Sequence, residues 1–482
     1  MSSLPPPPLT DPAPAPQPRH HLRTLLAWLI VLGCGGFFAA SAFERDAAED
    51  KNSDVATAHA QLLLQARYVV GANHLFRSVA TKSNTTDSLI ASVRAAAKTP
   101  GERLLTVPVI AELKNKDDAV AMLDELSPQI KDPAMRRHLQ ILRQIYTVNQ
   151  KPQGAERDEL IARFRWLGKL ALTWSDPPDA PERHQVIAAA QRTAIAAIVL
   201  VLIVLLAFLI GLVLFVIAAI FFFQGKLRPL YRPEPRAPVH YLESFAIYLL
   251  GMLALSLLFR YGVRVSGLAP SASFLLLPLI LLWPALGFGI ARTAAAIGWT
   301  LPHTPPRPPP FIDPRYLPPH VAPPRPTPAF LRALREIALG LVGFVGGLPI
   351  LALGMITTLI LSRLVHAEPV HPIIEAAGRG PKVTLQLYLL ACGVAPMVEE
   401  TFFRGALHHY LRGRHGFIIT ALVTSFLFAA IHPQGWTTIP LLASIGIVLS
   451  LLREWRLTLL APMTAHALNN FTAATFLVLA LS

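Results

Sequence analysis

Apolar stretches of membrane-spanning length recur along the chain and alternate with short polar segments. A helix needs about 20 apolar residues to cross a bilayer, and only structures that pair their own backbone groups are stable there. The pattern therefore predicts an all-α, polytopic membrane protein with about 8–9 transmembrane helices. The expected spans are Leu25–Phe43, Thr193–Phe223, Tyr241–Phe259, Ser271–Trp299, Phe330–Leu364, Thr384–Leu411, Phe417–Ile431, Ile439–Leu452 and Leu457–Leu481.

Residues 44–187, between the first two stretches, are charged and polar and follow a helical period. We expect an inserted helical extramembrane domain there, on the extracytoplasmic side. Its histidines, His59, His74 and His138, are scattered, and we expect them to be solvated helix residues. The segment contains no recognisable acid, base or metal motif, and its partner is unknown. Amphipathic helices are predicted at Ala58–Val70, Val120–Leu126, Met135–Tyr146 and Leu160–Leu172.

Proline-rich and apolar segments set the other boundaries. Residues 1–23 are rich in proline and should be disordered. Residues 24–43 are a signal anchor or a cleaved signal peptide. Residues 301–329 are again proline-rich and should form an extended cytoplasmic linker. Transmembrane helices then occupy residues 188–300, and residues 330–482 form a C-terminal membrane domain.

The net charge of +14 is concentrated in short loops between the expected spans. Basic residues in such loops are retained in the cytoplasm, so this charge indicates membrane topology and gives no reason to expect a nucleic-acid partner. We expect a bacterial plasma membrane protein with a cytoplasmic N-terminus. The two cysteines, Cys34 and Cys392, are too few and too far apart for a disulfide framework. The basic stretches are Lys226–Arg236, Arg307–Arg335, Arg412–Arg414 and Arg453–Arg456.

Two adjacent carboxylates, Glu399 and Glu400, and the nearby Arg404 lie inside a long apolar stretch. Each ionised group at membrane depth costs at least ~2.5–3.5 kcal/mol, so such groups usually have a partner or a function. Glu400 and Arg404 are four residues apart and share a helical face, whereas Glu399 points about 100° away. An ion pair would therefore leave Glu399 available for chemistry. A purely structural ion pair between helices is equally compatible with this motif.

Two further polar motifs follow in separate apolar helices. Phe428 and His432 are four residues apart, as are His466 and Asn470. Taken alone, such residues also occur as interfacial histidines or as hydrogen-bonding contacts between helices. Counted from the turn that begins at Gly413, Glu399 and His432 lie at nearly equal depths of about 21 and 24 Å. Such convergence is expected of a catalytic cavity.

Taken together, these motifs resemble the CPBP family of intramembrane endopeptidases, also called the Abi or CAAX-protease family, which includes the type II CAAX prenyl endopeptidases. The resemblance covers roughly residues 330–482. It rests on Glu-Glu-x-x-x-Arg, Phe-x-x-x-His and His-x-x-x-Asn, in this order, with the matching residues Glu399, Glu400, Arg404, Phe428, His432, His466 and Asn470.

The resemblance implies hydrolysis of a peptide bond in a membrane-associated protein or peptide, which includes prenylated CAAX-type substrates. Glu399 and His432 would activate water, while Glu400 would pair with Arg404. The remaining roles would be oxyanion stabilisation by His466 and Asn470, and packing of the His432 imidazole by Phe428.

The cofactor is left open by the sequence. Family members are described both as metalloproteases and as metal-free glutamate proteases. If zinc is present, its ligands would be Glu399, His432 and His466, because two histidines and one carboxylate form a common catalytic set. The close-spaced His-Glu-x-x-His motif is absent from the chain.

Two alternatives from other functional classes remain open. An ion- or proton-coupled transporter also places Glu, His and Arg inside a membrane, but it predicts inverted repeats. Residues 188–330 contain no second copy of the acidic motif. A non-catalytic membrane regulator of the same fold is the other alternative, and the intact motifs argue against it.

Overall fold

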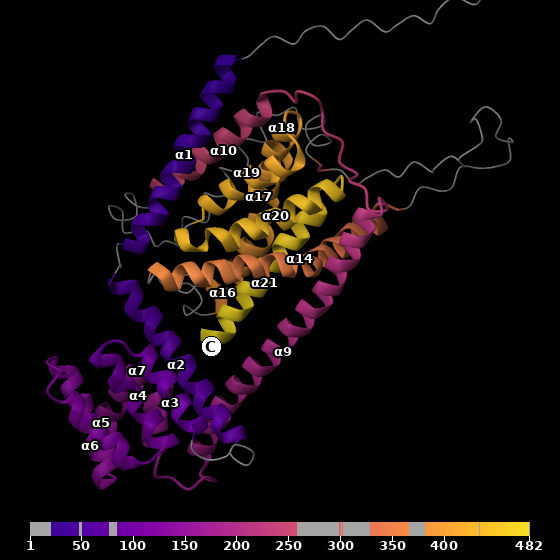
Figure 1. Cartoon of the computed structure of the whole chain (residues 1–482). Coiled ribbons are helices and arrows are strands. Elements are labelled where there is room, and N and C mark those ends of the chain that lie inside the picture. The colour runs from indigo at the N-terminus through magenta and orange to yellow at the C-terminus, as the bar shows by residue number, and fades with distance from the viewer. Residues whose placement is uncertain are drawn as a thin grey trace, which may run out of the picture.

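The computed structural model describes residues 21–47, 51–76, 84–257, 298–299, 301, 328–365, 381–432 and 434–481. These residues are mostly helical and include no β-strand, which confirms the all-α expectation. Figure 1 shows a bundle of shorter helices at one end of the molecule and longer helices above it. The expected span Ser271–Trp299 and the proline-rich linker fall almost entirely outside the described residues.

Four helices within the described ranges are long and apolar enough to cross a membrane, which agrees with an integral membrane protein. They lie in α1 (His21–Ala47), α9 (Pro181–Phe223), α14 (Ala329–Val365) and the segment Trp436–Trp455, which includes α20 (Ile439–Trp455). The predicted count of eight to nine spans stays a prediction. Other predicted spans also coincide with helices, namely α10 (His240–Leu257), α19 (Phe417–Ala430), α21 (Leu460–Leu481) and the continuous helical segment from Pro381 to Arg412.

The bundle of shorter helices surrounds one hydrophobic core, where Leu104, Leu123 and Leu142 are fully buried. Helix starts are fixed by caps: Thr99 and Glu102 form a capping box, and Asn115 caps the next helix through its side chain. The sequence therefore predicted the helical character of this segment, while its exact limits as a domain stay a prediction. Its helices are α2 (Lys51–Phe76), α3 (Asn84–Ala96), α4 (Pro100–Leu113), α5 (Lys116–Leu126), α6 (Pro133–Val148), α7 (Gly154–Phe164) and α8 (Trp166–Leu172).

Two expectations for this bundle are wrong. The helix predicted over Leu160–Leu172 is interrupted at Arg165, whose φ of 50° lies outside the helical range. His138 is not solvated, because it is only 3% exposed and its ring meets the edge of Phe164 at 5.6 Å. His74 also has a partner, since its Nε2 lies 2.9 Å from a carboxylate oxygen of Glu112.

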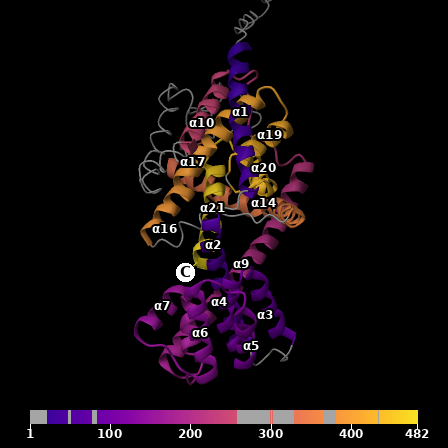
Figure 2. The same cartoon turned by 90° about the vertical axis from the view of Figure 1, so that its left-hand side faces the viewer.

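Helix α9 connects the bundle to the long helices, and its backbone closely approaches α2 at one end and α14 at the other. A side chain added at Gly71 of α2 would meet the carbonyl of Ala190 in α9 at 2.1 Å. One added at Gly211 of α9 would meet the carbonyl of Val345 in α14 at 2.2 Å. Glycine at each crossing lets the two backbones approach closely, as small residues do between membrane helices. Figure 2 shows α9 rising from the bundle toward α14.

A second hydrophobic core joins α1, α10, α19, α20 and α21 around one central helix. The central helix runs from Pro381 to Arg412 and contains two π-helical stretches, η4 (Leu389–Val394) and η5 (Thr401–Leu407). A proline in a helix removes one hydrogen bond and clashes with the preceding turn, and Pro396 lies two residues after the end of η4. The α-helical parts are α16 (Pro381–Tyr388), α17 (Ala395–Glu400) and α18 (His408–Arg412).

Candidate active site

The central helix carries the acidic motif, and its ion pair is present as predicted. Arg404 Nη1 lies 3.0 Å from Glu400 Oε1, and both side chains are fully buried. The second terminal nitrogen of Arg404 donates to the carbonyl of Gly446 in α20, at 3.0 Å. The guanidinium therefore holds Glu400 and also fastens the central helix to its neighbour.

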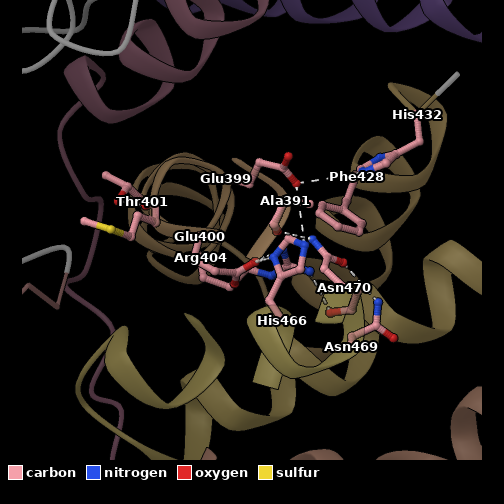
Figure 3. A network of polar contacts seen from close by, with 12 residues as sticks. Ala391, Glu399, Glu400, Thr401, Arg404, Phe428, His432, His466, Asn469 and Asn470 are labelled. Carbon is pink, nitrogen blue, oxygen red and sulfur yellow. Dashed lines mark hydrogen bonds and ion pairs between the residues drawn. The ribbon is translucent and has the colours of Figure 1, made fainter. Parts of the chain in front are cut away.

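His466 of α21 lies between the two glutamates (Figure 3). Its Nδ1 is 2.9 Å from Glu400 Oε1, and its Nε2 is 3.9 Å from Glu399 Oε2. Because an ionised carboxylate only accepts hydrogen bonds, the geometry assigns a proton to Nδ1 of His466. Its Nε2 then faces Glu399, with the ring held in place by Glu400.

Glu399 has the environment of a reactive group. Its side chain is 18% exposed, and within the described part of the chain its Oε2 atom is buried without a hydrogen-bond partner. This oxygen faces the Nε2 atoms of His432 and His466, each at 3.9 Å (Figure 3). These distances are too long for direct hydrogen bonds and are of the kind that one bridging water spans.

Phe428 orients the second imidazole. The carbonyl of Phe428 lies 2.6 Å from His432 Nδ1, and the two rings are 4.6 Å apart. A carbonyl oxygen only accepts, so the geometry assigns the proton to Nδ1 and leaves Nε2 of His432 as an acceptor. The Phe428 ring also meets the His466 ring at 5.6 Å and lies 4.7 Å from the Arg404 guanidinium carbon. It thus packs against three polar groups of the site.

The side-chain amide of Asn470 makes a contact that the sequence did not suggest. Its side-chain nitrogen donates to the carbonyl of Ala391, at 2.8 Å, and its oxygen accepts from Asn469 at 3.2 Å. Ala391 belongs to the π-helical stretch η4, where the regular hydrogen-bond ladder changes. The amide therefore ties α21 to the central helix and keeps one N–H donor for another group.

The candidate zinc ligands do not form a metal site as they stand. Ligands at about 2.0–2.2 Å from a tetrahedral zinc lie roughly 3.4 Å from one another. Glu399 Oε2 is 3.9 Å from both imidazole nitrogens, which is wider. Across the described ranges, no group of three or more His, Cys, Asp or Glu side chains is arranged to hold a metal ion. We therefore derive no catalytic step through a metal.

Sequence reasoning missed Arg453. The sequence suggested a basic cytoplasmic turn at this position, but Arg453 is 1% exposed and its Nε donates to the carbonyl of Arg404 at 3.1 Å. Its guanidinium carbon also lies 4.8 Å from the centre of the Tyr231 ring. Arg456, from the same turn, is buried in an ion pair with Glu336, with contacts of 2.5 and 2.8 Å. The adjacent Glu454 was the one available signal that this turn is not purely a solvated basic loop.

Comparison with known proteins supports the resemblance. Residues 381–472 match a family model described as type II CAAX prenyl endopeptidase Rce1-like. The chain is also similar to the membrane-embedded CAAX protease MroQ of Staphylococcus aureus, with 27% identity over 123 residues. That alignment covers 24% of this chain and 49% of the relative, so it spans about half of the relative's length. No solved structure matches the chain. All seven motif residues, from Glu399 to Asn470, lie inside the matched region.

Proposed function

Because the C-terminal region of this integral membrane protein is similar to the CPBP family of CAAX endopeptidases, we propose that the protein is an intramembrane endopeptidase that cleaves membrane-associated substrates. One observation carries this proposal. Glu399 is partly exposed, and its Oε2 faces two imidazoles at 3.9 Å, whereas its neighbour Glu400 is fully buried in an ion pair with Arg404. A structural ion pair accounts for Glu400, but it gives no reason to place a second, partly exposed carboxylate between two imidazoles inside a membrane, where ionised groups usually have a partner or a function.

The proposed first step is water activation. Glu399 Oε2 and His432 Nε2 are both acceptors and lie 3.9 Å apart. They are placed to receive the two hydrogens of one water molecule, which leaves a lone pair of its oxygen free for attack. As that oxygen bonds to the scissile carbonyl carbon, one proton passes to Glu399. Return of this proton to the amide nitrogen then releases the amine product.

His466 would stabilise the tetrahedral intermediate. Uptake of a proton from solvent at Nε2 before the attack would give this imidazole a positive charge. Nδ1 then donates to Glu400 and Nε2 donates to the oxyanion, and His466 keeps both protons through the cycle. The buried carboxylate of Glu400 stabilises that charge, while Arg404 keeps the carboxylate in position. The second N–H of the Asn470 amide is a further candidate donor to the oxyanion. In this mechanism Glu400 acts through His466 and does not touch the substrate.

The substrate class is a finer proposal that rests on the family match. We infer a CAAX-type peptide, prenylated at its cysteine, presented from the bilayer. We also infer a bacterial plasma membrane with the N-terminus in the cytoplasm, because the basic loops favour that topology. The bundle formed by α2–α8 would select or position the substrate, since no catalytic motif is found in its sequence.

The test is cleavage of fluorogenic peptides, prenylated and unprenylated, by the purified full-length protein. Glu399→Gln should lower kcat by about 10²–10⁴-fold, the usual contribution of a general base, without changing the melting temperature. Glu156→Gln removes an exposed carboxylate of the outer bundle and is the matched control, with activity unchanged. Wild-type turnover by Glu399→Gln would refute the assignment. The same assay with a chelator, followed by zinc, measures the metal dependence directly.

A further inference from the structure

A basic cleft opens in the outer bundle, away from the acidic motif. It has a volume of about 780 Å³ and lies between α2, α7, α8 and the first turns of α9. Five basic side chains line it, against a single acidic one. The basic residues are Arg67, Arg157, Arg165, Lys169 and Arg192, and the acid is Glu182.

Three of these five cations have no partner among the described residues, and a fourth has a weak one. Arg157 and Glu182 approach only to 3.7 Å, and an exposed pair of this kind interacts weakly. Arg165, Lys169 and Arg192 are exposed and form no side-chain hydrogen bond or ion pair with any other described residue. The positive electrostatic potential also extends beyond the cleft. The pKa of His59 is lowered first by burial and then by the charges of Arg165 and Arg163. Five cationic side chains around one cavity repel one another unless an anion joins them.

The backbone at Arg165 is a separate observation. Arg165 joins α7 to α8 with φ 50° and ψ −123°, a conformation that glycine adopts readily and that strains other residues. Strain of this kind persists where the surrounding structure holds it and is concentrated at functional positions. Here the strained residue supplies one of the cleft's exposed cations.

The cleft also lies where α9 becomes apolar. Arg192 is the last charged residue of that helix, and residues 193–223 carry no charge. Many apolar side chains in this stretch are exposed, among them Val201, Leu206 and Phe222, as expected of a surface that faces lipid. Arg192 therefore marks the polar end of the apolar stretch, on the side of the outer bundle.

One wall of the cleft is apolar. Trp166 is 5% exposed and donates its indole N–H to the carbonyl of Val186, while Arg67 lies over its ring at 5.8 Å. Ile161 and Ala189 continue this wall. A free phosphate would leave most of the 780 Å³ unfilled. A phosphodiester attached to glycerol and acyl chains matches both the cations and the apolar wall.

We propose that this cleft binds the phosphate-bearing headgroup of an anionic phospholipid at the membrane surface. The ligand chemistry is a phosphate anion held by Arg165, Lys169 and Arg192, with the lipid backbone along the Trp166 wall. This binding site is distinct from the peptidase site and does not depend on its mechanism. It would fix the outer bundle against the bilayer surface.

The experiment uses the full-length protein in nanodiscs and measures binding of a fluorescent phosphatidylglycerol, with phosphatidylcholine as the zwitterionic comparison. The test variant is Arg165→Gln/Lys169→Gln/Arg192→Gln. Each basic residue near an anionic surface contributes about a 5-fold gain in affinity, so the triple variant should bind about 100-fold more weakly. The matched control is Arg94→Gln/Lys116→Gln/Lys131→Gln, which removes the same charge from exposed positions outside the cleft.

Helicity and melting temperature establish that each variant folds. If the triple variant does not fold, Arg192→Gln alone replaces it, with an expected loss of lipid affinity of about 5-fold. Cleavage of a model peptide in detergent should be unchanged in all variants. The lipid-binding proposal can therefore fail independently of the peptidase proposal. Equal losses in the cleft and control variants, or equal affinity for the two lipids, would overturn the site. Protection against thermal unfolding by inorganic phosphate alone, without a preference for phosphatidylglycerol, would overturn the lipid as its ligand.

Discussion

Replacement of Arg404 by methionine tests the buried network that supports the candidate active site. The substitution keeps an unbranched apolar side chain in place of the arginine stem and removes the guanidinium. Four contacts are lost: the ion pair with Glu400, the hydrogen bond to the carbonyl of Gly446, and the contacts of the cation with the rings of Phe428 and Phe403. Glu400 then keeps only the Nδ1 contact with His466.

The expected magnitude follows from burial. Both members of the ion pair are fully buried, so Arg404→Met leaves a carboxylate without its counter-charge in a medium that does not solvate it. Breaking such a pair from one side destabilises proteins by about 3–5 kcal/mol. A typical folded domain is stable by only ~5–15 kcal/mol, so lower protein levels in the membrane should accompany this loss. Cleavage activity should fall with it, because Glu400 and His466 lose their fixed positions.

A double variant separates charge from packing. Glu400→Gln/Arg404→Met removes both charges, and replacing both partners of a buried pair is often neutral. We therefore expect most of the lost stability to return, while activity stays low because a neutral amide does not stabilise a charged His466. Arg94→Met removes an exposed arginine of the outer bundle and should leave both quantities unchanged.

The assay is denaturant unfolding of the purified protein in detergent, combined with peptide cleavage by the same samples. Arg404→Met with stability within about 0.5 kcal/mol of the wild type, the range of ordinary surface substitutions, would refute the reasoning. So would equal destabilisation by the single and the double variant, because the cost would then lie in packing and not in an unpaired charge.

Two further predictions concern the outer bundle and the topology. Burial would raise the pKa of Glu112, but its hydrogen bond to His74 and the charge of Arg183 together lower it below the ordinary value of 4.5. The ionised Glu112 therefore contributes its full stabilisation above pH 4.5 and loses it as the pH falls through the lowered pKa. Glu112→Gln should make the free energy of unfolding less dependent on pH on the acid side. An unchanged pH–stability profile would contradict this. In a background without Cys34 and Cys392, an impermeant thiol reagent on intact cells should label Lys131→Cys and spare Arg232→Cys, and the reverse pattern would invert the proposed topology.

Local geometry explains which parts of the site the sequence could predict. The pairing of Glu400 with Arg404 follows from a four-residue spacing, which survives even though η5 begins between them. The approach of His432 to Glu399 follows from counting residues on either side of one short turn, because antiparallel helices place equal counts at equal depth. Both inferences need only helix geometry and the positions of charged residues.

Tertiary contacts explain what the sequence could not predict. Nothing in the local pattern indicates that Asn470 would bind the carbonyl of Ala391, because that contact depends on how α21 crosses the π-helical stretch. The interruption at Arg165 is likewise hidden, since Leu160–Leu172 is periodic throughout and the break appears only as a positive φ. His138 was misjudged for the same reason, because the ring of Phe164 covers it from another helix.

Arg453 shows how one basic residue can satisfy two constraints. Basic residues near a span favour the cytoplasmic side, so the proposed topology expects a basic residue at this position. Its side chain nevertheless reaches inward, where Nε donates to the carbonyl of Arg404 and a terminal nitrogen donates to the carbonyl of Leu457. Arg404 belongs to the π-helical stretch η5, where the change in hydrogen-bond register leaves carbonyls that need other donors. Two arginines therefore hold the central helix beside Glu399: Arg404 through its side chain, and Arg453 through the backbone of Arg404.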